Sequence, residues 1–302
     1  MKNENIGTLL ALLAAVISGI SIPANKLFIV NLDPTVFTAI RAVIIGTIFF
    51  FISLYQSKFD LKNFKKVSWK YLFAIAIIGG VFAFLLFFNG LKLTTAGRGA
   101  FLHKTLPLYT VILAFFFLKE KITKKMIYAL AIMFIGIIAL YFSQINPAEL
   151  WMNPSLGDLL IIGATFLWAI ENIIARKAMI KGETNYIVSF ARMFFGGLIL
   201  FGFVLLFGKF NVLLTLSIEQ WTNILISTGL LFGYVFFWYW SIKKINVSKA
   251  TTLLLLSPVV SLILGILMFS EPLPLFQLIG SALILVGAYF VVGVKSEVKE
   301  RI

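Results

Sequence analysis

The chain has 302 residues, of which 61% are hydrophobic and 13% are charged, and it carries a net charge of +14 with no cysteine. Apolar runs of about 18 residues or more recur along its whole length, which excludes a soluble globular fold because no soluble core could bury them. With a single histidine and no cysteine, ordinary zinc sites and Cys–His nucleophile pairs have no support. The sequence also lacks a Walker-type glycine loop, so ATP-driven transport within this chain is not expected.

The apolar runs predict ten membrane-spanning helices. They do not alternate with a period of two, so they are typical of helices and not of barrel strands. The predicted spans, in chain order, are 6–30, 34–55, 68–91, 95–118, 122–142, 156–180, 184–207, 218–241, 248–269 and 273–294. The first run is long and lacks a convincing small-residue cleavage site, so we expect it to stay in the membrane and not to act as a removed signal peptide.

Lysine and arginine gather in alternate loops, which predicts the orientation. Most of the 26 basic residues fall after the even-numbered predicted spans or in the tail, whereas the long loop at 143–155 has none. By the positive-inside rule, both termini are expected on the cytoplasmic side of a prokaryotic cell membrane, with the lipid bilayer as the surrounding partner. These charges are loop anchors and form no separate basic domain, so no nucleic-acid partner is expected.

The rarest residue types recur at a constant offset of 151 residues. The matches are Lys26/Lys177, Arg41/Arg192, Gly46/Gly197, Lys92/Lys243, Pro107/Pro258, Glu120/Glu271 and Gly136/Gly287, together with the basic pair Arg98/Lys249. Charged matches in one register are hard to ascribe to chance in so apolar a chain. The sequence therefore predicts two five-helix halves, 1–145 and 156–295, followed by a cytoplasmic tail at 296–302.

An odd number of spans in each half has a geometric consequence. The second copy must enter the membrane from the side where the first copy left it. The predicted fold class is therefore an all-α integral membrane protein made of two inverted-topology five-helix repeats. Transporters commonly use this architecture and hold substrate at mid-membrane between the halves.

Two segments, 90–140 and 241–292, share one pattern. Each has small residues at a helix start, a proline about ten residues into the helix, a glutamate at its end, and a final helix with an internal glycine. Both segments resemble the second half of an EamA domain of the drug/metabolite transporter superfamily, and the arginines Arg41 and Arg192 are similar to one in the second helix of that domain. The resemblance covers nearly the whole chain. It implies a ten-helix secondary transporter or exporter of small metabolites, amino acids among them.

Two charges without a repeat counterpart lie deep in predicted spans. Lys104 is roughly 13 Å into the fourth span at 1.5 Å per residue, and Glu171 is far from either surface in the sixth. An uncompensated charge at mid-membrane costs at least about 2.5–3.5 kcal/mol, so each needs a partner, water or a ligand. Either the two form a salt bridge that orients the spans, or Lys104 receives a carboxylate or phosphate while Glu171 receives an ammonium or a coupling proton. If they hold the two ends of one zwitterion, the substrate is an amino acid.

Small and polar residues that follow one face of a span are further candidates for substrate contact, because a face turned to lipid has no need of them. Ser21 and Asn25 continue a small and polar stripe on the first span, and Trp168 and Asn172 lie close to the deep glutamate of the sixth. Each stripe is also consistent with a close helix contact, which small residues favour in membranes.

The eighth span and the single histidine give the remaining candidates. Tyr234 is deep enough to meet substrate, whereas the aromatic residues at 238–240 are expected to form an interface belt. His103 neighbours Lys104 and is a candidate either for proton coupling or for packing with a hydrogen bond.

Three repeated pairs are candidates for hinge or gating roles. These are Pro107 and Pro258, Glu120 and Glu271, and Arg41 and Arg192. The prolines are expected to kink their helices and free a carbonyl, as a hinge or as a static bend. The glutamates are expected to cap a following helix start or to pair with lysines, in every state or in one conformation only. The arginines are expected to hold helices together through carbonyls or glutamates, with direct ligand contact as the alternative.

Together these features predict a secondary transporter that exports a small-molecule substrate, with no cofactor and with possible proton coupling. Efflux of cationic amphiphilic drugs is one alternative, and a polytopic enzyme acting on lipid is another. The sequence does not define the oligomeric state, and a monomer is sufficient because ten helices can enclose a cavity.

Overall fold

The computed structural model describes residues 2–28, 32–57, 67–142, 150, 152–269 and 273–296, and the regular structure within these ranges is entirely helical. Ten helical segments of the described chain are long and apolar enough to cross a membrane. This confirms the predicted class, an all-α membrane protein of two inverted five-helix repeats.

The first half contains five spans. They are α1 (Lys2–Phe28), α2 (Pro34–Gln56), α4 (Trp69–Ile77) continued by η1 (Ile78–Phe82) and α5 (Ala83–Leu93), α6 (Ala96–His103) continued by α7 (Leu106–Leu113) and η2 (Ala114–Leu118), and α8 (Lys124–Tyr141). The segments η1 and η2 are single π-helical turns.

The second half repeats this order. Its spans are α10 (Leu156–Ile180), α11 (Asn185–Phe190) continued by the π-helical turn η3 (Ala191–Phe195) and α12 (Gly196–Leu206), α14 (Ile218–Lys244), α15 (Val247–Leu253) continued by the 3-10 turn η4 (Leu254–Leu256) and α16 (Ser257–Phe269), and α17 (Leu275–Val292). A short helix, α13 (Phe210–Leu214), lies in the connection between α12 and α14.

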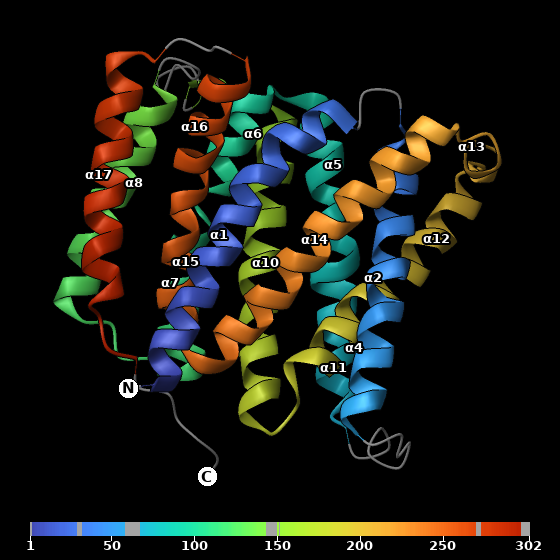
Figure 1. Ribbon diagram of the computed structural model, residues 1–302, viewed down its shortest axis with the longest axis horizontal. Helices are drawn as coiled ribbons and strands as arrows, with labels where there is room; N and C mark the ends of the chain where they lie inside the picture. Colours follow the sequence, from blue (N-terminus) through green and yellow to red (C-terminus); the bar gives the residue numbers. More distant parts are fainter. Residues whose placement is uncertain are drawn as a thin grey trace.

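Helix α1 begins and helix α17 ends on the same face of the bundle, here termed the terminal face (Figure 1). The backbone N–H of Ser296, beyond the last helix, donates to Oε1 of Glu4 in the first turn of α1 at 2.7 Å. The other surface is termed the opposite face. With five spans in each half, the second half therefore starts from the opposite face and runs inverted.

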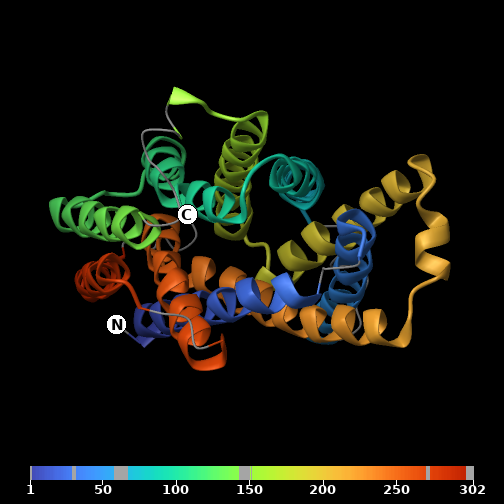
Figure 2. The same ribbon diagram turned by 90° about the horizontal axis from the view of Figure 1, so that it is seen from above.

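Spans from different halves pack lengthwise in a symmetric pattern (Figures 1 and 2). Helix α1 lies along α14, and its repeat counterpart α10 lies along α5. The α8–α17 pair and the contact of α2 with α11, η3 and α12 each map onto themselves when the halves are exchanged. A pseudo-twofold axis in the membrane plane therefore passes through these two contacts.

Two repeated glycines allow the close approach of α2 and the seventh span on this axis. A Cβ on Gly46 would lie 2.4 Å from the Cα of Phe194, and one on Gly197 would lie 2.8 Å from the backbone nitrogen of Val43. Val43 and Phe194 are themselves separated by 151 residues, so the two contacts are symmetric images. Glycine is required at both positions because the facing atoms belong to backbone.

Polar side chains define where several helices start. In each, a side-chain oxygen accepts a backbone N–H of the first turn, which satisfies donors that have no partner inside the helix. These caps are Asp33 for α2, Thr95 for α6, Thr123 for α8, Ser155 for α10, Thr184 for α11 and Ser217 for α14. The ends of the spans thus follow from polar residues at the edges of apolar runs.

Candidate functional site

The fourth and ninth spans are interrupted next to their repeated prolines. Lys104 and Thr105 separate α6 from α7, and the turn η4 separates α15 from α16. Pro107 and Pro258 each stand second in the helix that follows, where the missing N–H leaves no helical bond broken. The sequence predicted a kink inside a continuous helix. The fourth span instead stops and restarts, because the N–H groups of Lys104 and Thr105 bond three residues back, at 2.9 and 3.1 Å.

Lys104 connects the two interruptions. Its Nζ donates to Oγ of Ser257 at 2.7 Å, and that hydroxyl donates to the carbonyl of Leu254 at 2.9 Å. Lys104 is 5% exposed, and within the described chain no carboxylate lies within ion-pair distance of it. The bundle interior therefore holds an ammonium group whose hydrogen-bond partner, among the described residues, is a hydroxyl from the other half.

Glu171 is fully buried and belongs to a different cluster. Its Oε1 accepts a hydrogen bond from the hydroxyl of Tyr239, and its Oε2 lies 3.8 Å from Nη1 of Arg192. The same Nη1 donates to the Tyr239 hydroxyl at 3.1 Å, so the three side chains join α10, η3 and α14. The salt bridge between Lys104 and Glu171, one of the two sequence interpretations, is absent because each side chain has its own partners.

A glycine makes room for the glutamate. A Cβ on Gly79, in the π-helical turn η1, would lie 2.3 Å from Cγ of Glu171. The carbonyl of Gly79 also accepts a hydrogen bond from Nε1 of Trp168 at 3.1 Å. The backbone of the third span at Gly79 thus contacts two side chains of the sixth span, Glu171 and Trp168.

His103 lies in an aromatic cluster. Its ring contacts those of Phe87 and Trp168 edge-on, with centroids 5.6 and 5.2 Å away, and Phe84 completes the cluster 5.4 Å from Trp168. Within the described chain His103 makes no side-chain hydrogen bond. Its surroundings match an aromatic packing role more closely than a relay of protons.

The end of the eighth span is buried, which corrects the sequence prediction of an aromatic belt. Trp238 and Tyr239 are 1% and 0% exposed. Trp238 donates through Nε1 to Oδ1 of Asn172 at 2.9 Å and stacks on Tyr234. Asn172 and Tyr234 are thus brought together through Trp238. The interior position of Trp238 and Tyr239 could not be distinguished by sequence from a membrane interface, because aromatic residues are favoured in both.

Arg41 has a polar cluster of its own near the start of α2. Its Nη1 donates to Oγ of Ser227 at 2.6 Å and lies 3.5 Å from Oδ1 of Asn25. Ser227 donates to the same Oδ1 at 2.6 Å, and the guanidinium carbon lies 4.0 Å from the centroid of the Phe37 ring. The first, second and eighth spans meet at this point.

Glu120 caps a helix, but not the helix that follows it in the chain. Its carboxylate accepts the backbone N–H groups of Val247 and Ser248 at 2.8 and 3.1 Å, and also the hydroxyl of Ser248. These residues begin α15 in the other half. Its repeat counterpart Glu271 lies outside the described residues.

The basic repeat pair forms one ion pair at each face, a role the sequence analysis did not assign. Arg98 pairs with Asp158 in the first turn of α10, and Lys249 pairs with Glu4 in the first turn of α1 at 3.2 Å. Lys249 also donates to the carbonyl of Val294 at 2.6 Å. The repeat marked both basic residues, but it could not reveal their acidic partners because those do not share the offset.

The remaining predicted residue, Ser21, lies outside these clusters, since its hydroxyl donates to the carbonyl of Ile17 in its own helix at 2.7 Å. Within the described part of the chain, no group of three or more histidine, aspartate or glutamate side chains is placed to hold a metal ion.

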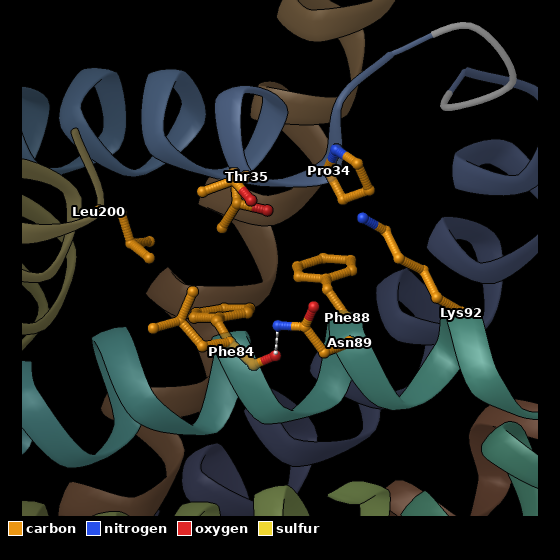
Figure 3. Close-up of a pocket in the computed structure, with 9 residues that line it drawn as sticks. Pro34, Thr35, Phe84, Phe88, Asn89, Lys92 and Leu200 are labelled. Carbon is orange, nitrogen blue, oxygen red and sulfur yellow. Dashed lines mark hydrogen bonds between the residues drawn. The ribbon is translucent and has the colours of Figure 1, made fainter. Parts of the chain in front are cut away.

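A narrow pocket lies between α2, α5 and α12, toward the opposite face. Its lining consists of Pro34, Thr35, Thr38, Phe84, Leu85, Phe88, Asn89, Lys92 and Leu200. Figure 3 shows Phe88, Asn89 and Lys92 on α5 facing Pro34 and Thr35 on α2. None of the residues predicted to contact substrate lines it.

The inverted ten-helix fold, with interrupted spans and charges in its interior, is an architecture of membrane transporters. A sequence model of the EamA-like transporter family matches residues 5–142 and 155–293, and the chain belongs to this family.

Known proteins similar to the chain agree with this assignment. The "Uncharacterized transporter YyaM" of Bacillus subtilis (strain 168) is 28% identical over 97% of this chain and 95% of its own. A "Probable amino-acid metabolite efflux pump" of Salmonella typhimurium is 26% identical over 93% of this chain and 92% of its own. A solved structure titled "Crystal structure of protein" has a TM-score of 0.76 at 17% identity, covering 94% of this chain and 97% of that one, and it shows the likeness of fold.

Proposed function

We propose that this protein is a secondary active transporter that exports small metabolites such as amino acids across the cytoplasmic membrane of a prokaryote. The halves 1–145 and 156–295 alternate in opening to the two sides, and the termini, with the tail 296–302, are cytoplasmic. The basic loops on the terminal face support this orientation. The name of the Salmonella relative supports the substrate class.

The charge distribution between the halves carries this proposal. Glu171 already has a counter-charge in Arg192 and a hydrogen bond from Tyr239, whereas Lys104 has a hydroxyl as its hydrogen-bond partner. A ligand that enters between the halves therefore meets a surplus of positive charge, which favours a carboxylate at Lys104. The rings of Phe87 and Trp168 lie close to Lys104's neighbour His103, where an ammonium group could be held over an aromatic face.

Glu171 is proposed to carry the coupling proton. Protonation of this carboxyl group removes its attraction to Arg192, the contact that joins the sixth and seventh spans. The interruptions beside Pro107 and Pro258 are proposed as the hinges of the motion, because a segment without continuous helical bonds bends at low energy. This arrangement disfavours efflux of cationic drugs, since no free carboxylate is offered to the cation in the described interior.

Transport in proteoliposomes tests the function. Uptake of radiolabelled amino acids is measured with and without a pH gradient for the wild type, Lys104→Met and Glu171→Gln. The repeat counterparts supply matched controls, Leu255→Met and Ile20→Val, which change no charge. We expect the controls to retain transport, Lys104→Met to lose it, and Glu171→Gln to lose its dependence on the gradient.

Three outcomes would contradict the proposal. Normal amino-acid flux in both charge variants would remove the basis for the substrate class. Transport activity that responds to cationic amphiphilic drugs and not to amino acids would favour drug efflux. Turnover of a lipid would favour an enzyme.

A further inference from the structure

Arg41 and Arg192 are repeat counterparts with different electrostatic surroundings. Arg192 has a carboxylate beside it, that of Glu171 at 3.8 Å. The residue that corresponds to this glutamate in the first half is Ile20. Arg41 therefore lacks the internal counter-ion that the other half supplies, and within the described chain no carboxylate lies within ion-pair distance of it.

The guanidinium of Arg41 is buried and only partly satisfied. Arg41 is 4% exposed, and its Nε has no hydrogen-bond partner among the residues that the structure describes. The ring of Phe37 offsets part of the charge through a cation–π contact, but a ring face supplies no acceptor oxygen to Nε. Intramembrane charges normally pair with another charge, with carbonyls or with a ligand. An anion would supply both the counter-charge and the acceptor that Arg41 lacks among the described residues.

The hydrogen bonds around Arg41 leave Asn25 with a donor for such an anion. Ser227 accepts a hydrogen bond from Arg41 and donates one to Oδ1 of Asn25, so the amide oxygen of Asn25 faces this network. The Nδ2 of Asn25 is then left as a donor, because the described chain offers it no acceptor. Together with the free edge of the guanidinium, it suits a planar carboxylate, which arginine binds through two parallel hydrogen bonds.

We propose that Arg41 and Asn25, supported by Ser227, form a carboxylate-binding site in the half of the bundle nearer the opposite face. Arg41 lies seven residues after the start of α2, roughly 10 Å into the membrane. The ligand is the carboxylate of a small organic molecule. This site is separate from Lys104, whose ammonium bonds to Ser257. It does not depend on the direction or coupling of transport.

Ligand-dependent thermal stability of the purified full-length protein in detergent tests the site. The probes are L-leucine, 4-methylpentanoate, which lacks the amine, and 3-methylbutylamine, which lacks the carboxylate, with sodium chloride as a further arm. We expect the first two to raise the melting temperature and the amine not to do so. An equal shift with chloride would show an adventitious inorganic anion only, and would overturn the assignment to carboxylates.

Asn25→Asp is the decisive variant. It preserves the shape of the side chain and the bond from Ser227, but it places a carboxylate beside Arg41 and removes the donor Nδ2. We expect it to melt at a higher temperature than the wild type without ligand, and to lose at least about tenfold in affinity for 4-methylpentanoate. A structural role alone for Arg41 predicts the first effect and not the second.

Lys104→Met separates this inference from the proposed transport function. If Asn25→Asp leaves binding unchanged while Lys104→Met abolishes it, the Arg41 site is overturned and the role of Lys104 stands. If Lys104→Met retains a carboxylate-dependent shift that Asn25→Asp removes, the Arg41 site is supported whatever the transport assay gives. Arg41→Lys keeps the charge but loses the planar pair of donors, so it should bind more weakly than the wild type.

Discussion

The fourth and ninth spans begin with equivalent segments on opposite faces, and one of the two is much better packed. In α15 every residue from Val247 to Leu253 is buried, whereas among the equivalent residues 97–102 of α6 only Gly99 and Leu102 are. Helix α6 is capped by its own Thr95. Helix α15 has no side-chain cap from its own first residues and takes its cap from Glu120 in the other half.

The difference shows at which face the two halves pack more tightly against each other. Under the proposed mechanism of alternating access, a structure that holds one of two states should pack the two equivalent segments unequally, and this difference agrees with that expectation. The contacts across the halves at the terminal face are tighter, and the segment at the opposite face is looser. We expect the alternative state to exchange these environments, as inverted repeats do in transporters.

Removal of the cap that Glu120 supplies to α15 should have the largest effect on the packing difference between the two segments. Glu120→Ala leaves two buried N–H groups and a hydroxyl of the first turn of α15 without their acceptor, which should destabilise the packing at the terminal face by about 3 kcal/mol. Because the chain has no cysteine, a single introduced thiol reports accessibility without background. Maleimide labelling at Thr251→Cys should be slow in the wild type and faster by on the order of 100-fold with Glu120→Ala.

The equivalent position in the first half is the control. Ala100→Cys should label faster than Thr251→Cys in the otherwise wild-type protein and change little with Glu120→Ala. Equal labelling rates at the two positions before Glu120 is changed would mean that the packing difference does not exist in the membrane.

The ion pair of Lys249 should have the next largest effect. Lys249 is 2% exposed and donates to Glu4 and to the carbonyls of Val292 and Val294, so Lys249→Met removes the donor that these three acceptors share. Because Glu4 keeps some contact with solvent, we expect a loss of about 2 kcal/mol, below the range for a fully buried pair. The melting temperature in detergent measures it, and an unchanged value would contradict the role of this pair at the terminal face.

The equivalent pair at the opposite face should matter less. The side chain of Arg98 is 17% exposed, so water replaces part of what Asp158 supplies. Arg98→Met should lower stability by about 1 kcal/mol, less than Lys249→Met. The test is whether Lys249→Met melts at a lower temperature than Arg98→Met. The reverse order would mean that the ion pair at the opposite face contributes more to stability.

The smallest effect is expected at Asp33, which lies on the opposite face outside both segments. Burial raises the pKa of Asp33, but the hydrogen bond from Lys209 and those from the N–H groups of Val36 and Thr35 lower it, and the net pKa is below its ordinary value. The ionised carboxylate of Asp33 therefore stabilises the folded state fully above its unfolded pKa of about 3.9. This stabilisation is lost as the pH falls through the lower pKa of the folded state.

Asp33→Asn isolates the ion pair, because asparagine caps a helix about as well as aspartate. We expect a loss of about 0.5 kcal/mol at pH 7, with the difference from the wild type unchanged down to about pH 5 and shrinking below about pH 4. Melting temperatures of the two proteins across this range check it. A difference that grew toward low pH would have the wrong sign for a depressed pKa.

The spans and their inverted order could be predicted from the sequence, because ten apolar runs and one constant offset are local or pairwise properties of the chain. The same offset marked Gly46 and Gly197, whose backbone contacts are symmetric images in the structure. Lys104 and Glu171 were recognisable as deep charges by counting residues from the ends of their spans.

Their partners could not be predicted in the same way. Glu120 was expected to cap the helix that follows it, but it caps one 127 residues later, because the fold brings that helix start beside it. Tyr239 joins Glu171 through a contact between the sixth and eighth spans, which no sequence periodicity records. Symmetry also fails to find these partners, since Glu171 and Tyr239 correspond to Ile20 and Phe88 in the first half.

The glycine crossing of α2 with the seventh span has a consequence for any measurement of movement. Since the contacts of Gly46 with Phe194 and of Gly197 with Val43 are related by the pseudo-twofold axis, the proposed exchange of the halves would leave this crossing unchanged. A pair of probes spanning that crossing should report one unvarying length. It provides an internal ruler against which displacements elsewhere in the bundle can be read.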